Sequence, residues 1–356
     1  MSVISAFFVQ RWKLIVNILT IIALVVFVYA IRDQLFETWN NLEDVRWWLL
    51  LLIIPLQAWN YDAQARLYRS LFMIVGNKFS YRHMYETSLE LNFVNNVFPS
   101  GGVSGISYFG VRMRSDNVTA GKATLVHLMK LVLLFLSFEV LLITGLFLIA
   151  LQGDVNTLLL MITVVLSTLL VVGTFMMAYI LGSEGRVKSF YKLTLYIARG
   201  FLKVIFPNRS YADLEFPRVS FLMLELHNNF KLIRTRYQEL KRPLLFALIA
   251  NVTEILTIYV VYLAFAQLVN PGAVILAYSV ANFAGFVSVL PGGVGVYEAI
   301  MTTVLVAGGV PVAISLPVTI MYRVLSSAVQ LPVGYYFYHR TIHQGHTIES
   351  ANVERG

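Results

Sequence analysis

Long apolar runs alternate with short polar segments along almost the whole chain. Hydrophobic stretches fall at about 14–31, 47–65, 81–98, 123–150, 155–182, 243–269, 273–290 and 312–338. A run of about 20 apolar residues is long enough to cross the hydrocarbon core of a bilayer as a helix. The first run has no small-residue cleavage site after it, which indicates an anchor rather than a removed signal. The pattern predicts an all-α polytopic membrane protein in which residues 1–356 form a single integral membrane domain.

Composition excludes several other classes of function. Apolar residues make up 58% of the chain and charged residues 13%, and that charged share is about half of what a soluble domain carries. The chain has no cysteine and six histidines, so we expect no disulfide, no thiolate chemistry and no metal site. A phosphate-binding Gly-x4-Gly-Lys-Ser/Thr motif does not occur in the sequence, so neither nucleotide-driven pumping nor any other cofactor is indicated.

The basic residues lie almost entirely on one side of the predicted spans. Of the 27 lysines and arginines, 23 fall in the segments that this alternation places on the same side, whereas Arg32 and Arg46 fall on the other. Cytoplasmic loops carry such an excess, so both termini are predicted to face the cytoplasm. The net charge of +8 therefore indicates a membrane surface and not a nucleic acid. Segment 183–242 is then a cytoplasmic basic amphipathic segment, and 339–356 is a cytoplasmic tail.

Two of the apolar segments are broken by glycine and proline in a similar way. Segment 81–114 begins and ends beside basic residues, whereas both ends of segment 273–309 lie on the uncharged side. Each is therefore predicted to enter the membrane and turn back, one from each face. The next span carries a lone cation in each case, at Lys130 and Arg323. This indicates an inverted repeat with one broken re-entrant helical hairpin in each half, as in many secondary transporters.

The two breaks are candidates for an anion site. Irregular backbone at membrane depth is tolerated only around a cavity or inside protein, and a helix that restarts there presents free N–H groups to an anion. Alternatively, the glycines only allow helices to pack closely. The candidate residues at the breaks are Pro99, Gly101, Gly102 and Gly105 in the first, and Pro291, Gly292, Gly293 and Gly295 in the second.

The two lone cations are the main candidates for binding a headgroup. A cation within a span costs at least about 2.5–3.5 kcal/mol on insertion scales, so Lys130 and Arg323 each need an anionic partner. A phosphate headgroup between two helix N-termini is one such partner. A structural ion pair is the alternative, for which the membrane carboxylates are Glu90, Glu139, Glu254 and Glu298.

Other polar residues beside the breaks complete the predicted substrate-binding set. Asn92, Asn95 and Asn96 share a helical face before the first break, and we expect them to bind either headgroup oxygens or the broken backbone. Glu90 and Glu254 are candidate carboxylates. Tyr297 and Glu298 would shape the second half of the site, although Glu298 is also placed to cap its own helix.

Two further readings stay open. Gly102-Val103-Ser104-Gly105 has the Gly-x-Ser-Gly form found around the nucleophile of rhomboid-type intramembrane serine proteases, with His127 as the candidate base. We consider this weak, because Gly295 replaces the serine in the second break.

In segment 183–242, the cations Lys188, Lys192, Arg199 and Lys203 share one helical face. That face is placed either on acidic headgroups or in solvent.

At the two breaks the chain resembles the flippase-like transmembrane domain of lysylphosphatidylglycerol synthases and their stand-alone relatives. The similar residues are Asn95 to Gly105 with Arg112 and Arg114, then Leu290 to Glu298, Gly309-Val310-Pro311 and Tyr322-Arg323. The resemblance implies an eight-helix-like domain that binds and translocates lipid, with aminoacyl-phosphatidylglycerol as substrate in the two-domain members. The chain ends at Gly356 without an aminoacyltransferase domain, so no enzymatic activity is expected and no catalytic residue is assigned.

The function predicted from all of this is translocation of an anionic or phosphate-bearing lipid between leaflets. The lipid is a phospholipid, an aminoacyl-phosphatidylglycerol or a polyprenyl-phosphate-linked lipid. A non-transporting lipid-binding scaffold subunit is the alternative, and the intramembrane protease ranks below it. The expected location is a bacterial or archaeal cytoplasmic membrane. Expected partners are anionic membrane lipids, with a homo-oligomer and a lipid-modifying enzyme left open.

Overall fold

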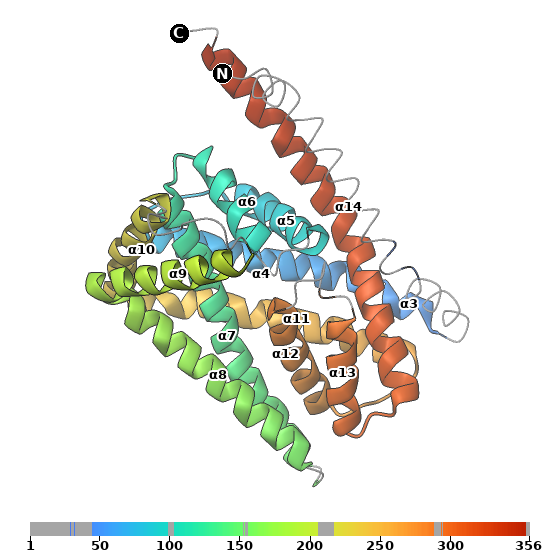
Figure 1. The fold of residues 1–356 in the computed structure, drawn as a ribbon. Coiled ribbons are helices and arrows are strands. Elements are labelled where there is room, and N and C mark those ends of the chain that lie inside the picture. Colours follow the sequence, from blue (N-terminus) through green and yellow to red (C-terminus); the bar gives the residue numbers. More distant parts are fainter. Residues whose placement is uncertain are drawn as a thin grey trace.

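The computed structural model describes residues 29, 32, 45–98, 103–151, 153, 156–205, 217–287, 293 and 295–353. These residues are almost entirely helical and contain no strand within the described ranges (Figure 1). The first predicted span, 14–31, lies outside them except for Tyr29. The helices are α3 (Trp47–Leu50), α4 (Ile53–Ile74), α5 (Tyr81–Val97), α6 (Val103–Arg114), α7 (Ala120–Ala150), α8 (Thr157–Leu181), α9 (Glu184–Ile205), α10 (Pro217–Thr235), the short 3-10 helix η1 (Tyr237–Leu240), α11 (Lys241–Ala264), α12 (Pro271–Val287), α13 (Val296–Ala307) and α14 (Val312–Val353).

Local chemistry explains where many of these helices begin and end. Ser80 and Thr119 cap α5 and α7 by accepting the backbone N–H groups of His83 and Lys122, which satisfies donors that have no partner in the helix. Asn156 caps α8 by accepting the N–H of Leu158 at 3.0 Å. Glycine with positive φ follows α4 at Gly76 and α13 at Gly309, where the left-handed conformation ends a helix at little cost.

Four described helices are long and apolar enough to cross a membrane. They are α7, α8, α11 extended by η1, and the part of α14 up to Ile342. The predicted stretch 47–65 falls mainly on α4, which is not one of them, because Gln57, Asn60, Asp62 and Gln64 interrupt its apolar sequence. The predicted tail after residue 338 is largely helical and continues α14, as Figure 1 shows.

The two halves of the chain meet along α4 and α11, which lie side by side and run antiparallel (Figure 1). Near one end Arg46 N–H donates to Ala264 O at 2.9 Å, and near the other the Arg236 guanidinium donates to Ile74 O at 3.4 Å. Between these points Asn60 Nδ2 donates to Ala250 O at 2.7 Å. The helices that follow α4 and α11 then cross between the halves, since α5 packs on α14 and α12 packs on α7.

Two clusters of buried apolar side chains support this arrangement. One cluster contains side chains from α7, α8, α11, α12, α13 and α14, and it includes Tyr262, Leu276 and Leu305. The other joins α4 to α7 with α9 to α11, and it includes Tyr68 and Phe109. Segment 183–242 forms α9 and α10, and α9 exposes a row of apolar side chains at Phe190, Leu193, Tyr196 and Ile197.

Candidate functional site

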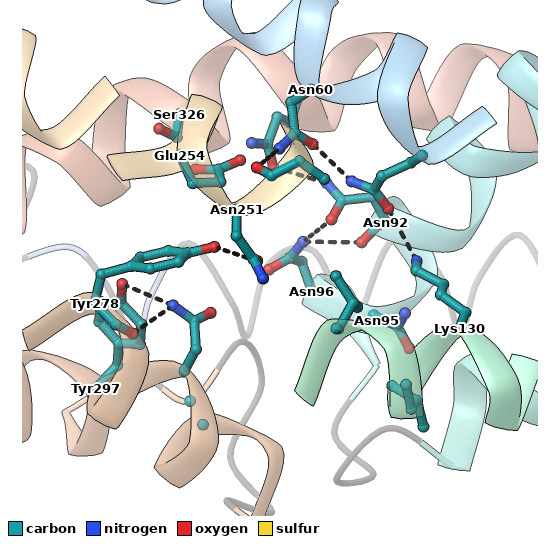
Figure 2. A pocket seen from close by; sticks show the side chains of 18 of the residues that line it. Asn60, Asn92, Asn95, Asn96, Lys130, Asn251, Glu254, Tyr278, Tyr297 and Ser326 are labelled. Carbon is teal, nitrogen blue, oxygen red and sulfur yellow. Dashed lines mark hydrogen bonds between the residues drawn. The ribbon is translucent and has the colours of Figure 1, made fainter. Parts of the chain in front are cut away.

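A cavity of about 450 Å³ opens where α4, α5, α7, α11, α12, α13 and α14 meet (Figure 2). Helices from both halves of the chain contribute to its walls. The structure brings together here seven of the residues predicted from the sequence: Lys130, Arg323, Asn92, Asn96, Glu254, Gly293 and Tyr297.

Lys130 lies in this cavity without an ion pair to any carboxylate among the described residues. Its Nζ donates to Gln64 Oε1 at 2.9 Å and lies 4.7 Å from the centre of the Tyr68 ring. Both partners are neutral, and the cation–π contact with Tyr68 offsets only part of the loss of hydration. An anionic ligand in the cavity would therefore find Lys130 available as a counter-charge.

Arg323, in contrast, is already paired with a carboxylate. Its guanidinium donates to Glu298 Oε1 at 2.5 Å and lies over the Tyr297 ring, 4.9 Å from the ring centre. The ion pair that the sequence left open as the alternative is therefore present. Glu298 sits behind the cavity and is not part of its lining.

Glu298 also occupies the helix N-terminus predicted to hold an anion. The N–H of Gly295 donates to Glu298 Oε2 at 2.7 Å, and α13 begins at Val296. A carboxylate near this N-terminus is stabilised by the free backbone donors and the helix dipole. The expectation of a free N-terminus at the second break is corrected accordingly, because the protein supplies the anion itself.

The break residues themselves are only partly within the described ranges. Pro99, Gly101, Gly102, Pro291 and Gly292 lie outside them. Gly105 is in the first turn of α6 and lies against the Asn95 amide, so a Cβ there would collide with that side chain. Gly293 lines the cavity with φ +67°, and Gly295 has φ +84°. A left-handed backbone at both positions favours glycine.

Glu254 is the acidic side chain among the described residues that line the cavity. Its Oε2 accepts the Tyr322 hydroxyl at 2.6 Å and the Gln57 amide at 3.4 Å. Neither donor is charged, and Glu254 makes no ion pair with a described cation. Figure 2 shows Glu254 and Lys130 on opposite sides of the cavity. Among the described residues, the cavity therefore contains one cation and one acid that form no ion pair.

Much of the remaining polar wall consists of amide side chains. Asn92, Asn95 and Asn96 were predicted, but the others were missed, because a single neutral amide interrupts an apolar run less than a charge does. A signal was present in the spacing of Gln57, Asn60 and Gln64, which places them on one face of α4. The amides that line the cavity are Asn60, Gln64, Asn92, Asn95, Asn96, Asn251, Asn282 and Gln330.

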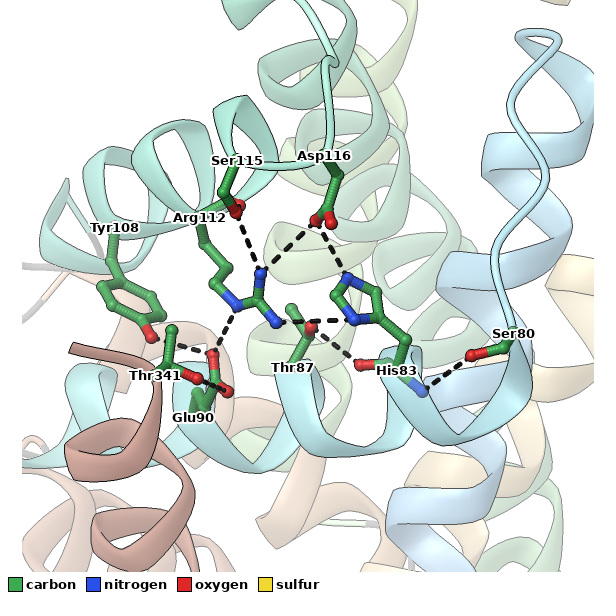
Figure 3. Close-up of polar contacts among 9 residues, drawn as sticks. All are labelled: Ser80, His83, Thr87, Glu90, Tyr108, Arg112, Ser115, Asp116 and Thr341. Atoms are coloured by element: carbon green, nitrogen blue, oxygen red, sulfur yellow. Dashed lines mark hydrogen bonds and ion pairs between the residues drawn. The ribbon is translucent and has the colours of Figure 1, made fainter. Parts of the chain in front are cut away.

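Glu90 does not take part in this site, contrary to expectation. It is buried, and its carboxylate accepts from Arg112 at 3.1 Å, Tyr108 at 2.8 Å and Thr341 at 2.7 Å (Figure 3). Arg112 also contacts Asp116, which is bonded to His83. These residues join α5, α6 and α14 beside the cavity. The contacts therefore support a structural role for Glu90.

His127 has an identified partner in the same region. Its Nδ1 lies 3.0 Å from the Tyr68 hydroxyl, and its ring packs against Tyr68 and Phe109. These contacts place the histidine in the aromatic cluster beneath Lys130. A base for a serine nucleophile would instead be directed at the serine hydroxyl.

Comparison with known sequences identifies the relatives of the chain. The family described as "Lysylphosphatidylglycerol synthase TM region" matches residues 14–334. A "UPF0104 membrane protein" of Methanothermobacter thermautotrophicus is 32% identical over 91 residues, which are 26% of this chain and 27% of that protein. A second protein described as UPF0104, from Pyrococcus horikoshii, is 27% identical over 152 residues, 42% of this chain and 45% of that protein. The matched segments thus span less than half the length of either relative.

Proposed function

Because this chain belongs to the family of the lysylphosphatidylglycerol synthase transmembrane region, it is a multi-pass membrane protein, and we propose that it moves a phosphate-bearing lipid between leaflets. The observation that carries the proposal is Lys130, a cation within a polar cavity whose described partners are neutral. A phosphate group is the ligand that such a cation favours in surroundings of low dielectric constant.

The arrangement of the helices supports a transport cycle. We infer that α4 to α7 and α11 to α14 are inverted repeats, with α5–α6 and α12–α13 as their re-entrant hairpins. In support, α4 and α11 run antiparallel, and each half packs its first hairpin helix on the long helix of the other, α5 on α14 and α12 on α7. Rocking one half against the other would expose the cavity alternately to each leaflet.

In this proposal the headgroup phosphate binds Lys130, and the amides bind its other oxygens. Arg323 and Tyr297 form the opposite wall and are held in place by Glu298. The acyl or prenyl chains stay in the surrounding bilayer. A phospholipid, an aminoacyl-phosphatidylglycerol and a polyprenyl-phosphate-linked lipid all supply the required phosphate. We further propose that the protein lies in a prokaryotic cytoplasmic membrane with both termini in the cytoplasm. A lipid-modifying enzyme is a candidate partner.

The test is lipid exchange by the full chain in proteoliposomes. A trace of fluorescent phosphatidylglycerol is added to phosphatidylcholine vesicles, and dithionite quenching measures how fast the label crosses the bilayer. We expect wild-type protein to accelerate the exchange and Lys130→Met to slow it by a factor of about 10 to 100, because a charge-assisted hydrogen bond contributes about 1.5–3 kcal/mol.

Lys122→Met is the matched control, since Lys122 lies on the same helix but contacts Asn77 outside the cavity. It should exchange lipid at close to the wild-type rate. Unchanged exchange in folded Lys130→Met protein would remove Lys130 from the site. Lipid that binds the wild type without crossing the bilayer would instead favour the scaffold alternative.

A further inference from the structure

The cavity contains an acid that the transport proposal does not by itself require. Glu254 lines the cavity on α11, and its described hydrogen bonds come from a phenol and an amide. An ionised carboxylate in a membrane protein is costly unless a cation or a proton compensates it. A carboxylate that meets only neutral donors is therefore placed to exchange a proton.

A chain of four amides ends on this carboxylate, and all its hydrogen bonds point the same way. Asn96 Nδ2 donates to Asn92 Oδ1 at 3.1 Å, and Asn92 Nδ2 donates to Gln330 Oε1 at 2.7 Å. Gln330 Nε2 donates to Gln57 Oε1 at 2.7 Å, and Gln57 Nε2 donates to Glu254 at 3.4 Å. The chain runs from α5 through α14 and α4 to α11, and so it connects the two halves of the molecule.

The polarity of this chain depends on the charge of Glu254. An amide has a donor end and an acceptor end, whereas an ionised carboxylate only accepts. When Glu254 takes up a proton, it also becomes a donor, and Gln57 can then turn its oxygen toward the acid. That rotation removes the acceptor of Gln330, so the change passes along the chain to Asn92 and Asn96 on α5.

The same acid sets the charge of the cavity. With Glu254 ionised, its charge balances Lys130, and the Arg323–Glu298 pair is already neutral. With Glu254 protonated, one positive charge remains for a phosphate. Uptake of an anionic headgroup and uptake of a proton therefore favour each other electrostatically.

No other acid lines the cavity among the described residues, so Glu254 is the carboxylate that can change its charge in this way. The other described titratable and charged side chains that line the cavity come from five helices: Tyr61 of α4, His127 and Lys130 of α7, Tyr278 of α12, Tyr297 of α13, and Tyr322 and Arg323 of α14.

We propose that Glu254 is a proton-binding site that couples lipid movement to proton movement in the same direction. One proton binds the Glu254 carboxylate from the side at which the headgroup enters, and it leaves to the opposite side with the lipid. A proton also fits the site better than a metal cation does, because Tyr322 and Gln57 both direct hydrogens at Oε2. The inference rests on the proposed lipid transport and adds its energy source.

The experiment uses the same proteoliposomes with a pH difference imposed across the bilayer and the membrane potential clamped. One pH unit is equivalent to about 1.36 kcal/mol. If one proton moves with each lipid, we expect trace fluorescent phosphatidylglycerol to accumulate in the leaflet on the alkaline side. Its ratio between the two leaflets should reach up to about tenfold for each pH unit imposed. Pyranine trapped in the vesicles should report proton entry that depends on the added lipid.

In Glu254→Gln protein, we expect exchange to continue but the leaflet ratio to fall to one, since the amide can replace the hydrogen bonds but does not carry a proton. Glu139→Gln is the control, because Glu139 is a membrane carboxylate on α7 that does not line the cavity. It should keep the wild-type asymmetry. If Glu254→Gln does not fold, the pyranine signal of the wild type decides the question.

Symmetric exchange by the wild type under a pH difference would overturn the proton site and leave lipid transport standing. Retained asymmetry in Glu254→Gln would overturn it as well. Absence of any exchange in the wild type would overturn the transport proposal and this inference together.

Discussion

At the scale of single residues, the five membrane carboxylates and cations of the candidate region have different environments. Arg323 and Glu298 neutralise each other, whereas Lys130 and Glu254 meet neutral partners. Glu90 is paired with Arg112 away from the cavity. Residue type alone does not distinguish these cases, because each depends on which helix lies opposite.

The Glu90–Arg112 pair gives a prediction about stability. The side chains are 1% and 11% exposed, so Glu90→Ala leaves a buried guanidinium with only its longer contact to Asp116, at 3.4 Å. We expect a loss of about 3–5 kcal/mol, measured as a lower midpoint of thermal unfolding in detergent micelles.

Glu86→Ala provides the control for this prediction. Glu86 pairs with Arg82 and, at 3.9 Å, with Arg340, whose side chains are 80% and 39% exposed. An exposed pair contributes at most about 1 kcal/mol, so the unfolding midpoint should move little. Equal effects of the two substitutions would argue against a structural role for the Glu90 cluster.

At the scale of elements, glycine decides how closely the crossing helices approach. Gly334 on α14 lies against the backbone of Leu89 on α5, and Gly145 on α7 lies against Gly272 on α12. Small residues of this kind let helix backbones come close in a membrane. Both contacts join a long helix of one half, α14 or α7, to a shorter helix of the other, α5 or α12.

The α5–α14 contact predicts opposite effects for two similar substitutions. A Cβ at Gly334 would lie 2.8 Å from Leu89 O and 2.8 Å from Phe93 Cβ, so Gly334→Ala forces the helices apart. We expect a loss of about 1–3 kcal/mol. At Gly173 on α8 a Cβ meets nothing within 4 Å, and Gly173→Ala should instead gain about 0.5–1 kcal/mol from helix propensity.

The measurement is again the thermal unfolding midpoint of the two variants beside the wild type. A lower midpoint for Gly334→Ala and an equal or higher one for Gly173→Ala would support the packing described. A Gly334→Ala protein as stable as the wild type would contradict it.

At the scale of the whole molecule, the distribution of charge predicts how the chain sits in the membrane. The helix formed by η1 and α11 is long and apolar enough to span the bilayer. Its beginning lies within the basic segment 183–242, whereas the loop after its end contains no basic residue. The positive-inside rule therefore places Gln238 inside and Leu268 outside.

Single-cysteine labelling tests this orientation, and the chain suits the method because it has no native cysteine. Gln238 and Leu268 are both exposed in the structure. We expect a membrane-impermeant maleimide added to intact cells to label Leu268→Cys and to leave Gln238→Cys unlabelled until the cells are opened. The reverse pattern would invert the orientation of the whole chain.

The sequence by itself determined the class of the protein, the family, and the positions of nearly all its helices. The described end of α5 at Val97 and the start of α6 at Val103 flank the predicted break, where the sequence places proline beside several glycines. The apolar character of a run is a local property, so a window of about 20 residues is enough to predict a membrane-spanning helix. Lys130 and Arg323 were also identified in this way, since a charge within an apolar run is visible without any fold.

Only the tertiary structure decided which of these charges are compensated. Glu298 reaches Arg323 across 25 positions of sequence, and Gln57 reaches Glu254 across 197. It also decided that polar α4 supplies part of the cavity wall and that α14 continues beyond residue 338. Such pairings depend on which helix faces which, and hydrophobic periodicity determines only that a face is buried, not what lies opposite it.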